Sequence, residues 1–301
     1  MSYLKNLKPV LDQLHPMEII STGATPDFHR DKTIKAVIFD IYGTLLISAS
    51  GDIIQDSYNT SMFKKALDYS GFQQLVPEEQ LMGIHRFFRE EVISEKQKAR
   101  EKGTLHPELN LIQIWTQTLN RAKKEGIIAF TPTSDFKAFT IIFELYSNRI
   151  WPMPGLKKTL DHLKNRKYPL GIVSNAQFYT PVIMNYFLSG SLKDDEFIDY
   201  FEKDLSVFSY KLLFGKPDPC IYRELLIPLN SRELTPQDVL YVGNDMLKDI
   251  YAASTVGFKT CFFAGDQRAY RLRTGNSEVK GLKPDHTITE LSQLLNILPG
   301  W

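Results

Sequence analysis

Four times along this chain, a short apolar run is followed by a turn and then by residues with helical spacing. The runs are Lys35–Asp40, Pro169–Asn175, Asp238–Asp245 and Lys259–Gly265. They are apolar almost throughout rather than in alternation, which is typical of strands buried on both faces of a parallel sheet. Strand, helix and strand repeated in this way predict an α/β fold with a doubly wound parallel sheet.

Helices are expected between these runs at Gly155–Lys167, Asp218–Leu226 and Asp249–Val256, and the weaker run Leu205–Tyr210 is expected to add a strand. A different pattern fills the region after the first strand. About a hundred residues there show apolar side chains three and four positions apart, which predicts amphipathic helices. Gly103 and Gly126 stand where two of these helices should stop.

A helical insert of this length is a second module rather than a loop. The expected organisation is an N-terminal extension (1–34), a core in two pieces (35–48 and 150–301) and an all-helical insert (49–149). In the extension, Leu4, Leu7, Leu11 and Leu14 have helical spacing, which predicts a short helix packed on the body of the protein.

Composition narrows the functional class. The formal net charge of +1 gives no whole-chain signal for binding nucleic acid or an anionic membrane, and no apolar run is long enough to span one. Two cysteines, Cys220 and Cys261, provide neither a disulfide framework nor zinc spacing. The N-terminus lacks the pattern of a secretion signal. A cytoplasmic protein acting on a small molecule is expected; the sequence leaves its oligomeric state open.

Polar residues gather where the predicted strands end. Ligands of an open parallel sheet bind at the carboxyl ends of its strands, so these residues should share one edge. Each alone has an ordinary explanation as a turn or helix-cap residue. Together they follow the chain order acid, hydroxyl, lysine, acid pair, which indicates a reactive site. The set comprises Asp40, Ser174, Asn175, Lys216, Asn244, Asp245 and Asp249.

Four segments resemble, in order and spacing, the signature motifs of the haloacid dehalogenase superfamily of hydrolases. They read FDIYGTLL, GIVSNA, GKPDPCIY and VGNDMLKDIYAASTVGFKT, and PDHTITELSQLL looks like that family's last strand and helix. The resemblance covers roughly Lys35 to Leu295. It implies a Rossmann-like core with a helical cap of the C1 type between the first and second motifs, which matches the insert.

The resemblance also implies roles for individual residues. Asp40 would be the nucleophile that forms a covalent aspartyl intermediate, and Lys216 would neutralise charge. Thr44, Ser174 and Asn175 would bind the substrate. Asp245, Asp40 and the backbone carbonyl of Tyr42 would hold Mg²⁺, while Asn244 and Asp249 would ligate it through water or orient Lys216. Oxygen ligands without His or Cys independently favour magnesium over zinc.

Tyr42 departs from the family's phosphatases, which carry a second Asp there as the general acid. A phenol is a poor general base at neutral pH. The family's 2-haloacid dehalogenases have an aromatic residue at this position, because a halide leaves without being protonated. In contrast, Asp245 is useful chiefly for Mg²⁺ and favours a phosphatase.

Other positions do not decide between the two activities. Arg86 and Arg89 are candidates for a halide-binding arginine of the cap, although a charged helix face explains them more simply. Tyr222 is compatible with both branches. The sequence therefore predicts a Mg²⁺-dependent hydrolase of a small phosphate ester, with a 2-haloacid dehalogenase and a non-catalytic binding protein as alternatives.

Overall fold

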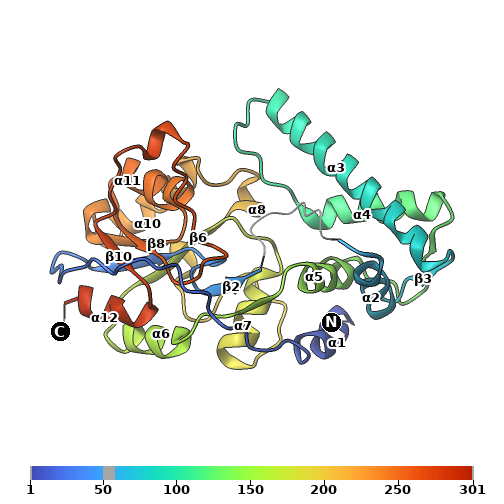
Figure 1. Cartoon of the computed structure of the whole chain (residues 1–301), viewed down its shortest axis with the longest axis horizontal. Helices are drawn as coiled ribbons and strands as arrows, with labels where there is room; N and C mark the ends of the chain where they lie inside the picture. Colours follow the sequence, from blue (N-terminus) through green and yellow to red (C-terminus); the bar gives the residue numbers. More distant parts are fainter. Residues whose placement is uncertain (1, 50–57, 300–301) are drawn as a thin grey trace.

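A computed structural model describes residues 2–49 and 58–299. An α/β part and a group of long helices lie side by side (Figure 1). Residues 50–57, the start of the predicted insert, lie outside the described residues. Within the described part, no helix is long and apolar enough to cross a membrane.

The α/β part is built on one six-stranded sheet. Its strands are β1 (Ala36–Phe39), β6 (Leu170–Ser174), β7 (Ser206–Phe208), β8 (Val239–Gly243), β9 (Lys259–Phe263) and β10 (His286–Ile288). Their order is β10-β9-β8-β1-β6-β7, and every neighbouring pair is parallel. The four predicted strands, the weaker fifth and the predicted last strand are all present, so the predicted parallel sheet is confirmed.

Helices cover both faces of this sheet because its central strands are apolar on both sides. Val37 and Phe39 of β1 pack in one apolar cluster, with α6 (Leu156–Asn165), α7 (Thr180–Ser189) and α12 (Leu294–Ile297). Ala36 and Ile38 pack in a second cluster on the other face. That face is covered by α9 (Cys220–Arg223), α10 (Leu226–Asn230) and α11 (Ala252–Thr255). In Figure 1, α6 and α12 lie below the sheet and α10 and α11 above it. The doubly wound arrangement is thus confirmed.

Two predicted helices differ in detail. The helix predicted at Asp218–Leu226 is split into α9 and α10, and Pro228, which has no N–H to donate, lies in the second piece. The helix predicted at Asp249–Val256 begins earlier, as a π-helix over Met246–Tyr251 that continues into α11. Its wider turn has a role in the candidate site.

The insert contains four main helices, α2 (Thr60–Ser70), α3 (Met82–Glu101), α4 (Leu111–Lys124) and α5 (Phe136–Ser147). Gly103 and Gly126 follow α3 and α4 with positive φ, as expected at helix ends. The expectation of helices alone is wrong in one respect. Gln73–Gln74 (β3) pairs antiparallel with Ile128–Ala129 (β4), a ladder too short to give a periodic signal.

The chain leaves the sheet and returns to it at one place. Strands β2 (Leu46–Ser48) and β5 (Ile150–Pro152) pair antiparallel there, next to the boundaries 48 and 150 predicted for the insert. The remaining short elements are α8 (Ser209–Leu212) and 3₁₀ turns at Glu78–Leu81, Lys203–Leu205, Pro236–Asp238, Ser277–Val279 and Leu291–Gln293.

The N-terminal extension contacts both parts of the molecule. Its helix α1 (Ser2–Leu11) buries Leu7 and Leu11 and packs on α5, which confirms the predicted short helix. Further along, Asp27 exchanges backbone hydrogen bonds with Thr287 on β10, at 2.9 and 2.7 Å. The extension therefore runs from the helical insert to the edge of the sheet (Figure 1).

Candidate active site

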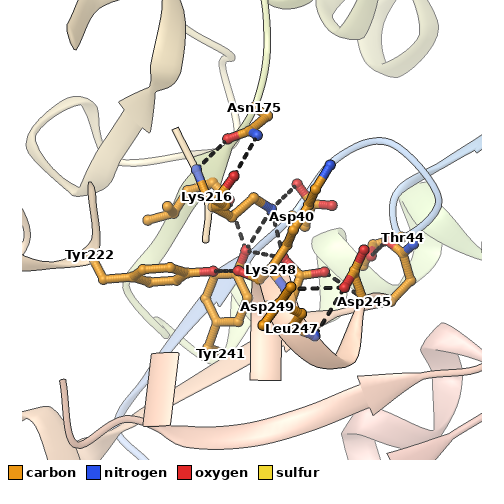
Figure 2. A network of polar contacts seen from close by, with 12 residues as sticks. Asp40, Thr44, Asn175, Lys216, Tyr222, Tyr241, Asp245, Leu247, Lys248 and Asp249 are labelled. Atoms are coloured by element: carbon orange, nitrogen blue, oxygen red, sulfur yellow. Dashed lines mark hydrogen bonds and ion pairs between the residues drawn. The ribbon is translucent and has the colours of Figure 1, made fainter. Parts of the chain in front are cut away.

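One lysine lies at the centre of the strand-end residues. The Nζ atom of Lys216 lies 2.7 Å from Asp40 Oδ1 and 2.6 Å from Asp249 Oδ1 (Figure 2). It also donates to the hydroxyl of Tyr241 at 3.2 Å. Lys216 is 5% exposed and Asp40 7% exposed. The structure therefore brings together a buried ammonium group and two buried carboxylates from three separate segments.

The second and third motifs hold each other in place. The backbone N–H of Lys216 donates to Asn175 Oδ1 at 2.8 Å, and Asn175 Nδ2 donates to the carbonyl of Lys216 at 3.2 Å. Gly215 makes this approach possible, since a Cβ there would lie 2.5 Å from Asn175 Oδ1. The side-chain amide of Asn175, directly after β6, thus fixes the backbone of Lys216, whose side chain extends to Asp40.

The π-helix after β8 directs Asp249 back into the site. The N–H of Ile250 donates to the carbonyl of Asp245 at 3.2 Å, five residues earlier, and the N–H of Asp245 donates to Asp249 Oδ2 at 2.9 Å. Tyr241 lies 3.1 Å from Asp249 Oδ1 through its hydroxyl. Asp249 is therefore bonded through both carboxylate oxygens, and its contact with Lys216 favours the orienting role over a metal-binding one.

These contacts determine how the charged groups titrate. Burial alone would lower the pKa of Lys216, but the charges of Asp249 and Asp40 outweigh it and raise that pKa above its usual value. Burial raises the pKa of Asp249, against the opposing effect of the Lys216 ammonium group. Lys216 is therefore held in its charged form by the two carboxylates beside it.

A second cation, the guanidinium group of Arg273, pairs with Asp245. Arg273 donates from Nη2 to Asp245 Oδ2 at 2.6 Å and from Nε at 3.0 Å. The backbone N–H groups of Leu247 and Lys248 donate to Oδ1 at 2.9 and 3.0 Å. Burial would raise the pKa of Asp245, but these bonds lower it below its usual value. Asp245 is an ionised carboxylate with both oxygens in use.

Asn244 and Thr44 form a structural link beside the site. Thr44 Oγ1 donates to Asn244 Oδ1 at 3.0 Å, and Asn244 Nδ2 donates to the carbonyl of Ala269 at 2.7 Å. Thr44 is fully buried. These bonds join the turn after β1 to the loop after β9, while the metal-binding and substrate-binding roles of the two residues remain predictions.

Ser174 and Tyr42 present two different hydroxyl groups. Ser174 is fully buried, and its Oγ has no hydrogen-bond partner among the described residues. The Tyr42 hydroxyl lies 3.0 Å from Thr180 Oγ1, at the start of α7. Burial, followed by the charge of Glu144, raises the pKa of Tyr42. The Tyr42 phenol therefore stays protonated at neutral pH.

Two cavities meet at these residues. A cavity of about 150 Å³ is lined by Asp40, Asp245, Asp249 and Arg273 among others. A larger cavity of about 510 Å³ extends from it toward the helical insert. Both are lined by Tyr42, Asn175, Lys216 and Lys248. The shared lining makes one continuous region large enough for a small molecule.

The basic residues of the insert that face the larger cavity are not those singled out from the sequence. Arg86 and Arg89 are exposed on α3 and line neither cavity. Lys96 and Arg100, further along the same helix, line the larger one. The charged-face explanation therefore accounts for Arg86 and Arg89.

The donor chemistry of the site suits a hard cation. Asp40 and Asp245 line the same small cavity and offer carboxylate oxygens, the type of ligand that Mg²⁺ prefers. Among the described residues, no three His, Cys, Asp or Glu side chains are placed to share one metal ion. Arg273 lies on Asp245, so a metal ion there would have to displace it.

Two residues of the site, Tyr241 and Arg273, were not predicted from the sequence. Tyr241 was read only as part of an apolar strand, although a tyrosine in a fully buried strand needs a partner for its hydroxyl. Its hydroxyl bonds Val173, Lys216 and Asp249. Arg273 follows β9, and the rule that placed the other groups at strand ends applies equally to this loop.

The comparisons with known proteins agree with this geometry. A model of the haloacid dehalogenase-like hydrolase family matches residues 34–257. The chain belongs to this family of hydrolases. A solved 2-haloacid dehalogenase from Pseudomonas syringae is 18% identical with a TM-score of 0.52, covering 87% of this chain and 96% of that one. At this identity the likeness concerns the fold alone.

Curated relatives cover a smaller share of the chain. Glyceraldehyde 3-phosphate phosphatase from Pyrococcus furiosus is 30% identical over 173 residues, 58% of this chain and 60% of that protein. The Rhythmically expressed gene 2 protein of Drosophila melanogaster is 22% identical over 180 residues, 58% of this chain and 65% of that protein. This chain thus matches less than two thirds of the length of either relative.

Proposed function

We propose that this protein hydrolyses a small phosphate ester, with Asp40 as the nucleophile and Mg²⁺ as cofactor. The observation that supports this most is the buried ion pair of Asp40 with Lys216, beside cavities of about 150 and 510 Å³. The ammonium group lies 2.7 Å from Asp40 Oδ1, where it would stabilise the negative charge that a nucleophilic carboxylate carries. The similarity to a sugar-phosphate phosphatase, 30% identical over part of its length, agrees with an ester substrate.

In the proposed reaction, a carboxylate oxygen of Asp40 bonds to phosphorus while the bond from phosphorus to the leaving oxygen breaks. Water then attacks the aspartyl phosphate, which frees inorganic phosphate and Asp40. Lys216 would neutralise charge on the phosphoryl oxygens. The second N–H of the Asn175 amide would be a further donor for these oxygens, and the family resemblance gives the same role to Ser174, which lines neither cavity.

Asp40, Asp245 and the carbonyl of Tyr42 would hold the metal ion. Bound Mg²⁺ would supply positive charge to the phosphoryl oxygens. The helical insert (49–149) would act as the cap that closes over the substrate, since Lys96 and Arg100 of α3 line the larger cavity.

A 2-haloacid dehalogenase is the second candidate. It is favoured by Tyr42, whose phenol is bonded to Thr180, because a departing halide needs no proton. The ion pair of Asp245 with Arg273 also suits a reaction without metal.

Assays of two products separate these functions. We expect purified protein to release phosphate from a panel of phosphate esters with Mg²⁺ and much less with EDTA, and Asp40→Asn to abolish this release. Asp218→Asn, in the third motif but outside both cavities, is the matched control and should retain activity. Halide release from 2-chloropropionate in EDTA would favour the dehalogenase. Release of neither product would indicate a binding protein on a hydrolase fold.

A further inference from the structure

The site leaves one chemical role without an obvious residue: protonation of the leaving oxygen. Tyr42 stands where a carboxyl group is expected, and its hydroxyl is engaged with Thr180. Asp40, Asp245 and Asp249 are each held in an ion pair with Lys216 or Arg273. Each of these three carboxylates is thus engaged with a cation, which leaves the role of proton donor to another group. A phosphate ester with a poor leaving group needs such a donor.

A different carboxyl group faces the same space from the helical insert. Glu144, near the end of α5, lines the larger cavity together with Tyr42, Asn175 and Lys216. It comes from a part of the chain in which no candidate acid was recognised from the sequence. Tyr42 lines the larger cavity together with Glu144 and the smaller cavity together with Asp40.

Hydrogen bonds hold Glu144 in this position. Asn148, one turn further along the chain, donates from Nδ2 to Glu144 Oε1 at 3.2 Å. Ser48 Oγ donates in turn to Asn148 Oδ1 at 3.0 Å, and Ser48 lines the smaller cavity together with Asp40. This chain of bonds connects Glu144 to the wall of the space in which Asp40 would react.

The partners of Glu144 are neutral. Within the described part of the chain, its side chain is bonded by Asn148 and Tyr179 and forms no ion pair. Burial is the largest influence on Glu144 and raises its pKa. Glu144 thus differs from the three paired aspartates, because no cation holds it in the ionised form.

Glu108, a second partly buried acid of the larger cavity, has a different set of partners. Glu108 also lines the larger cavity, but its carboxylate accepts from Ser209 Oγ at 2.7 Å, from the N–H of Leu109 at 2.9 Å and from Gln177 Nε2 at 3.2 Å. These bonds commit Glu108 to joining two loops.

We propose that Glu144 is the general acid of this enzyme and delivers its proton to the leaving oxygen of the phosphate ester. The proposal rests on the phosphatase function above. As the bond from Asp40 to phosphorus forms and the bond from phosphorus to the leaving oxygen breaks, the Glu144 proton passes to that oxygen and an alcohol departs. The resulting Glu144 carboxylate then accepts a proton from the water that attacks the aspartyl phosphate, which restores both residues.

The test compares two esters that differ in their leaving groups. An alkyl phosphate such as glycerol phosphate needs a proton donor, whereas p-nitrophenyl phosphate does not. We expect Glu144→Gln to lower kcat/KM for the alkyl ester by about 100-fold, the typical size of general acid catalysis, and to change p-nitrophenyl phosphate hydrolysis less than about threefold. Glu108→Gln is the matched control, and its effect should be the same on both esters.

Equal losses on the two esters in Glu144→Gln, or no loss on either, would overturn the proposal. If Glu144→Gln unfolds in a thermal melt, the wild-type protein is assayed instead with a series of aryl and alkyl phosphates. A weak dependence of kcat/KM on leaving-group pKa supports a proton donor, and a steep dependence overturns one. A wild-type protein that hydrolyses neither ester would instead refute the phosphatase function itself.

Discussion

At the scale of single residues, the three aspartates of the site are each held in an ion pair. Lys216 forms ion pairs with the carboxylates of Asp40 and Asp249, and Arg273 forms one with Asp245. Three carboxylates therefore share two cations. Lys248, Arg268 and Arg271 also line the small cavity, so its basic residues outnumber its acidic ones, which suits an anionic phosphoryl group.

Arg273 should compete with Mg²⁺ for Asp245. We predict that Arg273→Ala raises Mg²⁺ affinity by about fivefold, because displacing a half-buried ion pair costs about 1 kcal/mol. Isothermal titration calorimetry measures this directly, without substrate. Arg271→Ala is the control. Arg271 lines the same cavity, whereas the guanidinium group bonded to the Asp245 carboxylate is that of Arg273. Equal gains in both variants would show that only the overall charge matters.

Single residues were predictable where one rule placed them. Asp40 and Asp249 follow strands at the carboxyl edge, and Lys216 precedes a helix there, so their meeting followed from sheet topology. Arg273 and Glu144 reach the site from a long loop and from the helical insert. The strand-end rule indicates the loop of Arg273 without singling out that residue, and the approach of Glu144 depends on tertiary packing that no local pattern in the sequence encodes.

At the scale of elements, the turn after β1 is packed closely against two other segments of the site. Gly43 has φ +88°, and a Cβ there would lie 2.6 Å from Ala269 Cβ and 2.7 Å from Asn244 Nδ2. Three segments thus converge on one glycine: the turn after β1, the turn after β8 and the loop after β9. Their spacing sets where Asp40 and Asp245 lie relative to each other.

Gly43→Ala should therefore destabilise the protein more than a glycine substitution in open space. Gly103 has a similar φ of +92°, and a Cβ there would meet no atom within 4 Å, so Gly103→Ala reports backbone strain alone, about 1–2 kcal/mol. We predict that Gly43→Ala costs at least about 2 kcal/mol more in free energy of unfolding, measured by urea denaturation. Similar losses in both variants would contradict the packing argument.

Elements were predicted well where they were long or buried on both faces, and less well where backbone bonds depart from a regular pattern. The strands of the sheet and the helices of the insert followed from apolar periodicity. The π-helix depends on the Asp245 side chain taking the N–H groups of Leu247 and Lys248. The β3–β4 pair depends on contact between two segments that lie far apart in the sequence, Gln73–Gln74 and Ile128–Ala129. Neither leaves a repeat in the sequence.

At the scale of the whole molecule, the N-terminal extension is attached at several points. Asp31 pairs with Lys259 on β9 and accepts from the N–H of Thr33 at 2.9 Å. Burial would raise the pKa of Asp31, but these bonds lower it from 3.8 to about 2. Because the folded pKa lies below the ordinary value, this carboxylate stabilises the fold above about pH 4 and loses that effect as the pH falls toward 2.

Asp31→Asn should show this dependence. We predict that the variant unfolds with about 1–2 kcal/mol less free energy than wild type at pH 7, and that the difference shrinks between pH 4 and pH 2. Urea denaturation at several pH values measures the difference. Asp68→Asn, whose ion pair with Lys64 is exposed, should change little throughout. A difference that persists at pH 2 would mean that Asp31 acts through packing rather than charge.

The same extension limits how far the two halves of the molecule can separate. Hinge opening at the β2–β5 pair would carry α5 away from the sheet, yet α1 is packed on α5 while Asp27 is bonded to Thr287. The segment between α1 and Asp27 is thus a tether of fixed length across the hinge. Opening for substrate entry must therefore stay within the slack of this tether or detach α1 from α5, so the N-terminal helix sets the range of motion between the insert and the sheet that carries Asp40.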